Sequence, residues 1–535
     1  MAIKVGMLVL FFAVMIGVGI YSRKTATDIN GFVLGGRSVG PWLTAFAYGT
    51  SYFSAVIFVG YAGQFGWKFG IASTWIGIGN AVLGSLIAWV ILGRRTRVLT
   101  HKLDSSTMPD FFEKRFKSRG LKLFASAIIF VFLIPYTASL YNGLSRLFNM
   151  AFDIDYTVCV IVMAVLTGIY VIVGGYMATA INDFIQGIIM LIGIAAVIAA
   201  VLASHGGFMG SLSELAAYSD AGTVNGEIPG IFASFFGPDP FNLLFVVILT
   251  SLGTWGLPQM VQKFYAIKSE KAVKTGTIVS TAFAVIVAGG CYFLGGFGRL
   301  VADAVEKKED GTIIFDSIIP TMIQELPEIL IAVVVILVLS ASMSTLSSLV
   351  LTSSLTLTLD FIKGTVVKKM SEKKQVLCIR VFIVVFIAIS AVIAVVQYKS
   401  NVTFIAQLMG VSWGALAGAF LAPFLYSLYY KKVTAASCWV SFIFGSGFMV
   451  LNLFNTLGVL KLPIFNVCNN LLASPINCGA VTMIAGLIIV PIVSLVTKKP
   501  DTRFIEDIFE VFDEKVVVTR KNSLETSEKS NTFNN

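Results

Sequence analysis

Long apolar stretches separated by short charged segments make up most of this chain. Thirteen stretches of at least 18 residues contain no Asp, Glu, Lys or Arg. A helix needs about 20 mostly apolar residues to cross a bilayer, and lipid offers no partner to an unpaired backbone group. Barrel strands would alternate apolar with polar residues. The pattern predicts thirteen spanning helices, over 5–22, 38–67, 69–93, 123–145, 156–182, 184–213, 240–262, 275–298, 329–359, 381–398, 400–430, 433–460 and 462–497.

The composition leads to the same class of protein. The 535 residues include 39 basic and 29 acidic side chains, so only 13% are charged and 56% are hydrophobic. Soluble domains carry about 25% charged residues, and six Cys are too few for a disulfide scaffold. We expect an all-α polytopic membrane protein with a transmembrane domain over 1–500. Residues 501–535 form a cytoplasmic tail that is partly amphipathic and then disordered.

The basic residues predict the orientation of the chain. With the N-terminus outside and alternating spans, 31 of the 39 Lys and Arg fall on the inside, the side that positive residues favour. The predicted outer loop 204–239 has none. We therefore expect the C-terminus inside and a multi-pass protein of the plasma (inner) membrane. The net charge of +10 then reflects the membrane topology of the chain. We expect the protein to be embedded in the lipid bilayer, and the sequence indicates no nucleic acid and no obligate protein partner.

Two smaller features concern the end of the chain. Five apolar residues of the tail share one helical face, which predicts an interfacial or cytosol-packed helix: Phe504, Ile505, Ile508, Phe509 and Phe512. Cys468 and Cys478 share a predicted outer loop, where they either pair or remain free.

Missing motifs narrow the function. The chain has no Walker A pattern, HExxH, GxSxG or histidine–cysteine cluster, so we expect neither an ATP-driven pump nor an enzyme. It also lacks a TVGYG-like filter, which argues against a potassium-type channel. A transporter driven by an ion gradient remains.

Two spans carry helix-interrupting residues at corresponding places. Span 2 contains polar residues and Gly over 49–54, and span 7 contains two Gly and a Pro over 251–258. Each is the first span of a five-span repeat if spans 2–6 and 7–11 are the two halves. Transporters with inverted repeats place their binding sites at such breaks. Close helix packing through small residues is the alternative.

Polar residues within spans 6 and 9 are candidate cation ligands. A turn at Gly174–Gly175 should separate spans 5 and 6 and place Asp183 inside span 6, where an acid costs about 2.5–3.5 kcal/mol. An interfacial Asp is the alternative. Span 9 has five hydroxyls in seven residues, which either bind a hard cation or bond their own helix: Ser342, Ser344, Thr345, Ser347 and Ser348.

Five stretches together resemble one family. They are GFVLGGRSVGPWLTA (31–45), MPDFFEKRF (108–116), GGYMATAINDFIQG (174–187), GLPQMVQKF (256–264) and SASMSTLSS (340–348). In this order and at this spacing, they are similar to the sodium:solute symporter family, and most to its proline and pantothenate branches. The resemblance implies the LeuT-like fold of inverted five-helix repeats, with thirteen spans.

The resemblance also implies ligands for sodium, with one or two coupling ions. A first site would use the backbone carbonyls of Thr50, Phe53 and Ala341 with the hydroxyls of Ser344 and Thr345. Some members bind a second sodium, for which the matching residues are Asp183, Ser347 and Ser348, together with Ser344.

The implied solute pocket lies between the two breaks. The proline branch has an acid in the span-2 break where this chain has Tyr52, so the resemblance does not single out proline. We find no Lys or Arg at mid-depth in these spans, so a carboxylate would rely on helix N-termini and hydroxyls. The expected pocket residues are Tyr48, Ser51, Ser54, Asn80, Tyr136, Thr254, Trp255 and Gln407.

The sequence thus predicts a sodium-coupled secondary active symporter that imports a small organic solute by alternating access. An amino acid such as proline, pantothenate or another small carboxylate fits the resemblance. The alternatives are a sodium-independent uniporter or channel, and a solute sensor on the same fold that does not transport.

Overall fold

The structure is a computed structural model that describes residues 2–26, 28–220, 222, 225–309, 311–363, 365–367, 370–399, 405–466 and 471–512. Apart from three isolated bridges, regular structure in these ranges is helical. The α-helices are α1 (Ala2–Ser22), α2 (Ile29–Leu34), α3 (Pro41–Tyr52), α4 (Ala62–Phe69), α5 (Thr74–Gly79), α6 (Arg94–Lys102), α7 (Met108–Phe116), α8 (Arg119–Phe152), α9 (Tyr156–Ser204), α10 (Gly207–Ala216), α11 (Pro240–Leu252), α12 (Pro258–Ala266), α13 (Glu270–Ala284), α14 (Gly290–Gly295), α15 (Ile318–Gln324), α16 (Glu328–Leu355), α17 (Glu372–Lys399), α18 (Ile405–Tyr429), α19 (Ala435–Thr456), α21 (Pro475–Val496) and α22 (Thr502–Glu510).

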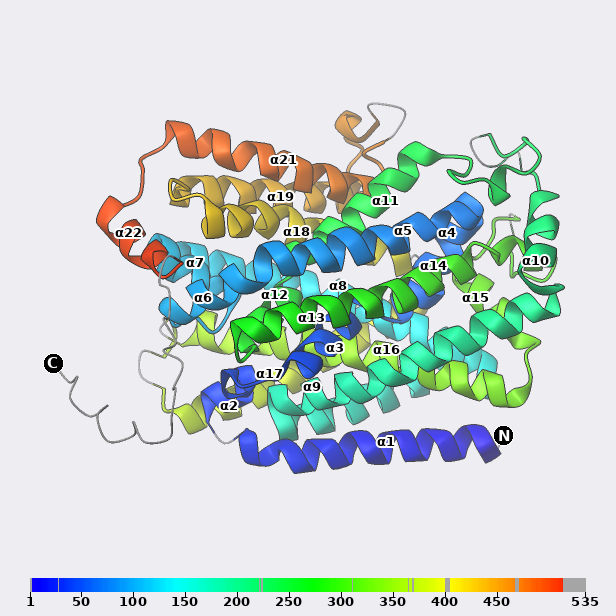
Figure 1. Ribbon diagram of the computed structural model, residues 1–535, viewed down its shortest axis with the longest axis horizontal. Helices are drawn as coiled ribbons and strands as arrows, with labels where there is room; N and C mark the ends of the chain where they lie inside the picture. The colour runs from blue at the N-terminus through cyan, green and yellow to red at the C-terminus, as the bar shows by residue number, and fades with distance from the viewer. Residues whose placement is uncertain are drawn as a thin grey trace, which may run out of the picture.

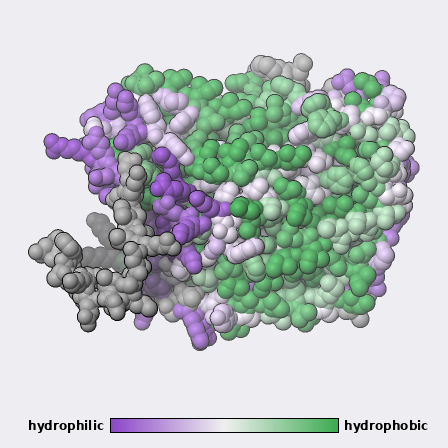
Figure 2. Space-filling view, viewed as in Figure 1, coloured by the Kyte–Doolittle hydropathy of each residue, from purple (hydrophilic) through white to green (hydrophobic). Residues whose placement is uncertain are grey.

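Within the described residues, eleven helical stretches are long and apolar enough to cross a membrane. The long helices run in roughly one direction, and α22 lies at the opposite end of the molecule from the start of α1 (Figure 1). Figure 2 shows apolar side chains across the middle of one face and hydrophilic ones at the end that holds α6, α7 and α22. Leu10, Ile161 and Val384 are among the exposed apolar side chains. An apolar exterior around buried polar groups defines a multi-pass membrane protein.

Glycines in unusual backbone conformations divide two of the eleven stretches. Tyr156–Ser204 passes Gly175, at φ 57° and ψ −149°, where a Cβ atom would lie 2.9 Å from the Phe32 ring. Val56–Lys102 passes Gly70, at φ 61° and ψ −145°, where a Cβ would lie 2.0 Å from the Phe232 carbonyl oxygen. Only glycine is accommodated at either position. The predicted turn at Gly174–Gly175 is therefore present.

Both predicted helix interruptions are also present. Helix α3 ends at Tyr52, Phe53 is extended at φ −83° and ψ 125°, and helical structure resumes at Ala55 and continues through the π-helix η3 (Val56–Tyr61). In the second half, α11 passes into the 3₁₀ turn η8 (Gly253–Trp255). Leu257 is then extended at φ −79° and ψ 120°, and α12 starts with Pro258. Proline suits a first helical position, because the missing N–H would have no intrahelical partner there.

Helix α16 is the central element of the bundle and continues into the π-helix η12 (Thr356–Ile362). It contacts α9, α8, α17 and α3, and its described side chains are buried almost throughout. The polar residues of α16 therefore face protein rather than lipid. Two of its neighbours, α3 and α9, carry the other residues of the predicted site.

The predicted tail helix is α22, which packs against the protein. Its residues Ile505, Ile508 and Phe509 are buried. The Lys117 ammonium lies 4.0 Å from the Phe504 ring centroid, and the Arg95 guanidinium lies 4.5 Å from that of Phe512. Residues 513–535 and Cys468 lie outside the described residues, so the disorder remains a prediction and the pairing of Cys468 with Cys478 remains open. Cys478 is buried in α21.

Candidate cation and solute site

Five oxygen atoms from α3 and α16 converge beside the first helix break. The Ser344 hydroxyl lies 3.1 Å from the Thr50 carbonyl oxygen and 3.0 Å from that of Ala341. The Thr345 hydroxyl lies 3.2, 3.1 and 3.1 Å from the carbonyl oxygens of Thr50, Phe53 and Ala341. The five predicted ligands of the first sodium site are thus brought together, and all five residues are buried.

The break explains why the carbonyl groups of Thr50 and Phe53 are available. The last carbonyls of a helix have no intrahelical donor, and the extended Phe53 ends α3 immediately after Thr50, Ser51 and Tyr52. The two hydroxyls hold only two protons, whereas they make five close contacts with three carbonyl oxygens. Lone pairs are therefore in surplus. Oxygen donors of this kind suit a hard monovalent cation.

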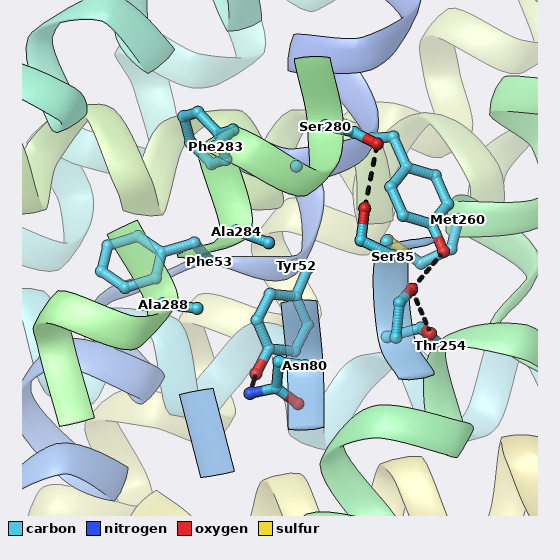
Figure 3. A pocket seen from close by; sticks show the side chains of 13 residues that line it. Tyr52, Phe53, Asn80, Ser85, Thr254, Met260, Ser280, Phe283, Ala284 and Ala288 are labelled. Carbon is cyan, nitrogen blue, oxygen red and sulfur yellow. Dashed lines mark hydrogen bonds between the residues drawn. The ribbon is translucent and has the colours of Figure 1, made fainter. Parts of the chain in front are cut away.

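A small cavity with a mostly apolar surface and a few polar side chains lies beside α3. Three of the eight expected pocket residues line it: Tyr48, Asn80 and Thr254. Tyr52 and Ser85 also contribute to the lining (Figure 3). The enclosed space is about 10 Å³, room for about one water molecule. A solute of amino-acid size therefore needs the surrounding helices to move apart. The lining is completed by Gly49, Phe53, Gly84, Met260, Ser280, Phe283, Ala284 and Ala288.

Hydrogen bonds connect the two helix breaks across this cavity. The Asn80 amide donates to the Tyr52 hydroxyl, as Figure 3 shows, and its oxygen accepts from the Ser251 hydroxyl at 3.1 Å. The Tyr48 hydroxyl donates to the Gly84 carbonyl at 2.8 Å, and the Thr254 hydroxyl lies 3.1 Å from the same oxygen and 2.8 Å from the Ser251 carbonyl oxygen. Asn80 and Gly84 belong to the π-helix η5 (Asn80–Ile87). A solute that replaced these bonds would act on α3 and α11 together.

The other expected pocket residues do not line this cavity. The Tyr136 ring packs edge-on against Trp413, with ring centroids 5.9 Å apart, and Trp413 in turn packs against Tyr52. Trp255 donates its indole N–H to the Leu83 carbonyl at 2.9 Å. Three more residues lie away from the lining: Ser51, Ser54 and Gln407.

Against the expectation of no Lys or Arg inside these spans, one lysine is buried within the bundle. Lys263 is buried in α12, with its ammonium 3.6 Å from the Asp183 carboxylate and 3.1 Å from the Ser348 hydroxyl. The charge-free stretch ends at residue 262, which predicted Lys263 in the following loop. A helix that starts at Pro258 places Lys263 in its second turn, which was the available signal. Ser347 donates its hydroxyl to the Ser344 carbonyl in its own helix, at 2.9 Å.

A second buried ionic cluster joins α7, α8 and η12. The Lys122 ammonium lies 2.9 Å from Asp110, 2.7 Å from Glu113 and 3.6 Å from Asp360. Asp360 also accepts a hydrogen bond from the Thr107 hydroxyl at 2.6 Å. Asp360 was not among the predicted buried acids, because the charge-free stretch 329–359 ends one residue earlier. The cluster fixes one end of the α16–η12 span against α7.

Broken helices that carry oxygen ligands, together with a cavity between the breaks, define a secondary transporter rather than an enzyme. The family model described as the sodium:solute symporter family matches residues 32–445. The chain belongs to the sodium:solute symporter family, and it is a sodium-coupled symporter of a small solute.

Individual relatives agree with this assignment. The chain is 29% identical to the osmoregulated proline transporter OpuE of Bacillus subtilis over 499 residues, which cover 92% of this chain and 94% of that protein. It is 31% identical to a sodium/proline symporter of Staphylococcus aureus over 448 residues, covering 82% and 84%. Among solved structures, a sodium-coupled sialic acid symporter matches with a TM-score of 0.70 at 17% identity, over 93% of this chain and 99% of that one. The last similarity shows the shared fold.

Asp110 generates a prediction about acid stability. Burial alone would raise the pKa of the Asp110 carboxyl, but Lys122 and Lys114 outweigh burial and hold this pKa below its ordinary 3.8. The resulting stabilisation is present above the ordinary pKa and is lost as the pH falls through the lower folded-state value. Asp110→Asn should therefore cost about 2 kcal/mol at neutral pH, and the difference from the unchanged protein should begin to narrow as the pH falls below about 4.

Thermal unfolding of the purified protein between pH 7 and pH 3 measures this difference. Asp104→Asn is the matched control, because Asp104 is 94% exposed and its pair with Arg37 at 3.5 Å should add little. Equal melting temperatures for Asp110→Asn and the unchanged protein at pH 7 would contradict the assignment.

Proposed function

We propose that this protein imports a small, net-neutral solute by alternating access, driven by sodium bound at the five oxygens of Thr50, Phe53, Ala341, Ser344 and Thr345. The observation that carries the proposal is the convergence of these oxygens where α3 is interrupted. Their surplus of lone pairs suits a cation, and the ligands come from two separate helices. A bound ion therefore links α3 to α16.

The link supplies a coupling mechanism. Sodium entering from outside ties α3 to α16 and fixes the broken segment, which also carries Tyr48 and Tyr52 of the cavity. Solute binding replaces the hydrogen bonds between the breaks and closes the outer side. Opening toward the inside separates α3 from α16, so the ion loses its ligands and leaves with the solute. The ion acts only because its affinity differs between these states.

The cavity lining favours a zwitterion over an anion. No Lys, Arg, Asp or Glu is among the residues that line it, so a solute with a net charge would meet no counter-charge there. The amine and carboxylate of an amino acid can instead be met by carbonyls, hydroxyls and the amide of Asn80. Relatives named as proline transporters make proline the first solute to test. Tyr52 and Asn80, which bond each other, are the residues that we assign to solute selection.

We further propose thirteen spans in the LeuT-like arrangement, with the N-terminus outside and the C-terminus inside, in the plasma membrane. The number of spans rises from eleven to thirteen when two long stretches are divided, Val56–Lys102 at Gly70 and Tyr156–Ser204 at Gly175. An odd number agrees with the positions of α1 and α22 at opposite ends (Figure 1). The basic residues of α6, α7 and α8 support the inside assignment of their end.

The sodium site predicts the effect of a double substitution. Ser344→Ala with Thr345→Ala removes two of the five oxygens, so the sodium concentration for half-maximal uptake should rise about 100-fold or more. Uptake of labelled proline into vesicles, with and without a sodium gradient, is the measurement. Ser342→Ala is the matched control, because its hydroxyl bonds the Val338 carbonyl of its own helix at 2.7 Å.

The same assay separates the alternatives. A uniporter or channel would show uptake that does not depend on the sodium gradient, and a sensor would show none with any solute of a metabolite panel. Unchanged sodium dependence in the double variant would remove the cation-site assignment.

The cavity predicts a loss of solute affinity. Asn80→Ala should raise the KM for the transported solute about 10- to 100-fold, equivalent to roughly 1–3 kcal/mol of lost hydrogen bonding. Thr250→Ala is the control, because the Thr250 hydroxyl bonds the Val246 carbonyl within α11 at 2.9 Å. If both variants gave the same KM as the unchanged protein, Asn80 would be a packing residue.

The orientation predicts which residues can be labelled from outside. In a background without the six native cysteines, a membrane-impermeant maleimide should label Asn225→Cys but not Lys117→Cys in intact cells. Both positions are exposed, and both should react after the cells are opened. The reverse pattern in intact cells would invert the topology.

A further inference from the structure

Lys263 places a positive charge inside the bundle, next to the sodium site. The lysine is 3% exposed and Asp183 is 0% exposed, so neither charge is solvated by water in this state. The ammonium also lies 5.3 Å from the centroid of the Tyr176 ring. Lys263 comes from α12, Asp183 from α9 and Ser348 from α16. The three helices therefore meet at one buried charge pair.

A chain of hydroxyls connects this pair to the broken helix. Ser51 donates its proton to the Ala47 carbonyl at 2.6 Å, so the 2.9 Å contact between Ser348 and Ser51 uses the proton of Ser348. The Lys263 ammonium then donates to the Ser348 oxygen at 3.1 Å. The hydrogen bonds therefore run in one direction, from the Lys263 ammonium to Ser348, then to Ser51 and to the Ala47 carbonyl. A sodium ion would meet the same Ser348 lone pair and the same carboxylate.

Charge balance allows only one cation in this place. Asp183 is the sole carboxylate in contact with Lys263 among the described residues, and the other oxygens nearby belong to neutral hydroxyls. The ammonium already balances the single negative charge. A sodium ion on Asp183 and Ser348 would share that carboxylate with a second positive charge in a water-poor interior, where like charges repel strongly. Because the ammonium is covalently attached to the protein, its local concentration at this place does not depend on the concentration of free cations.

We propose that Lys263 acts as a built-in cation, which occupies the position of a second sodium and limits this symporter to one sodium per cycle. The proposal rests on the proposed function, because it counts the ions that the symporter couples. Ser344 stays with the first site, where it contacts Thr50 and Ala341. Ser348, four residues further along α16, serves the ammonium instead. Lys263 is thus a positioning residue that determines how many ions bind.

Binding of radioactive sodium to the purified full-length protein in nanodiscs tests the proposal without any solute. At saturating sodium, the unchanged protein should bind one ion per molecule, and Lys263→Met should bind two, because Asp183 is released for a second ion. Lys263→Arg keeps the charge and should bind one. Lys263→Met with Asp183→Asn should return to one, because the carboxylate is gone. Lys68→Met is the matched control, since Lys68 lies over the Phe315 ring, 5.6 Å from its centroid, and should leave the ratio at one.

A second neutral variant, which keeps a hydrogen-bond donor, tests whether misfolding of Lys263→Met affects the result. Lys263→Gln can still donate to Ser348, and it should also bind two ions. Two ions on the unchanged protein, or one ion on both Lys263→Met and Lys263→Gln, would overturn the proposal.

The first site separates this outcome from a failure of the proposed function. Ser344→Ala with Thr345→Ala should abolish sodium binding in the unchanged background but leave one ion in the Lys263→Met background. If Ser344→Ala with Thr345→Ala still bound one ion per molecule while Lys263 was present, the first site and the proposed function would be refuted. Two ions on the unchanged protein would refute only the built-in cation.

Discussion

Carbonyl groups released inside the bundle are the constraint on which the rest of this structure depends. Lipid cannot bond them, so the break after Tyr52 requires partners from the protein or from a bound ion. Helix α16 supplies two hydroxyls, but their two protons are too few for the oxygens that meet there. The hydroxyl-rich centre of α16 meets this requirement, and its burial between α8, α9 and α17 keeps the oxygens away from lipid.

Much of the architecture could be predicted from the sequence, because lipid imposes strong rules. Charge-free stretches located the helices, and the residues around Gly49 and Pro258 located both breaks. Helix ends were harder. Lys263 and Asp360 each lie just beyond a charge-free stretch, yet their helices continue, so two buried acids acquired a lysine partner that the pattern did not show. The direction of side chains could not be predicted either: Ser51 bonds Ser348 and the Ala47 carbonyl and does not line the cavity.

The two buried ionic clusters have different consequences for movement. Lys122 joins α7, α8 and η12, with acids on three sides. Lys263 joins α12 to α9 and α16 through a single carboxylate and one hydroxyl. The side chains of Lys263 and Asp183 are only 4% and 0% exposed, against 15% for Lys122 and 31% for Glu113. Separation of α12 from α9 would therefore leave two charges with neither partner nor water, whereas water can reach part of the Lys122 cluster.

A built-in cation also sets a limit on how far the cell can concentrate the solute. One sodium that moves down a tenfold gradient supplies about 1.4 kcal/mol, and a potential of 100 mV adds about 2.3 kcal/mol. Together they support roughly 500-fold accumulation of a neutral solute, whereas two ions would support on the order of 10⁵-fold. Lys263 therefore lowers the maximal accumulation of the solute. In return, the cell has to pump out one sodium ion instead of two for each solute taken up.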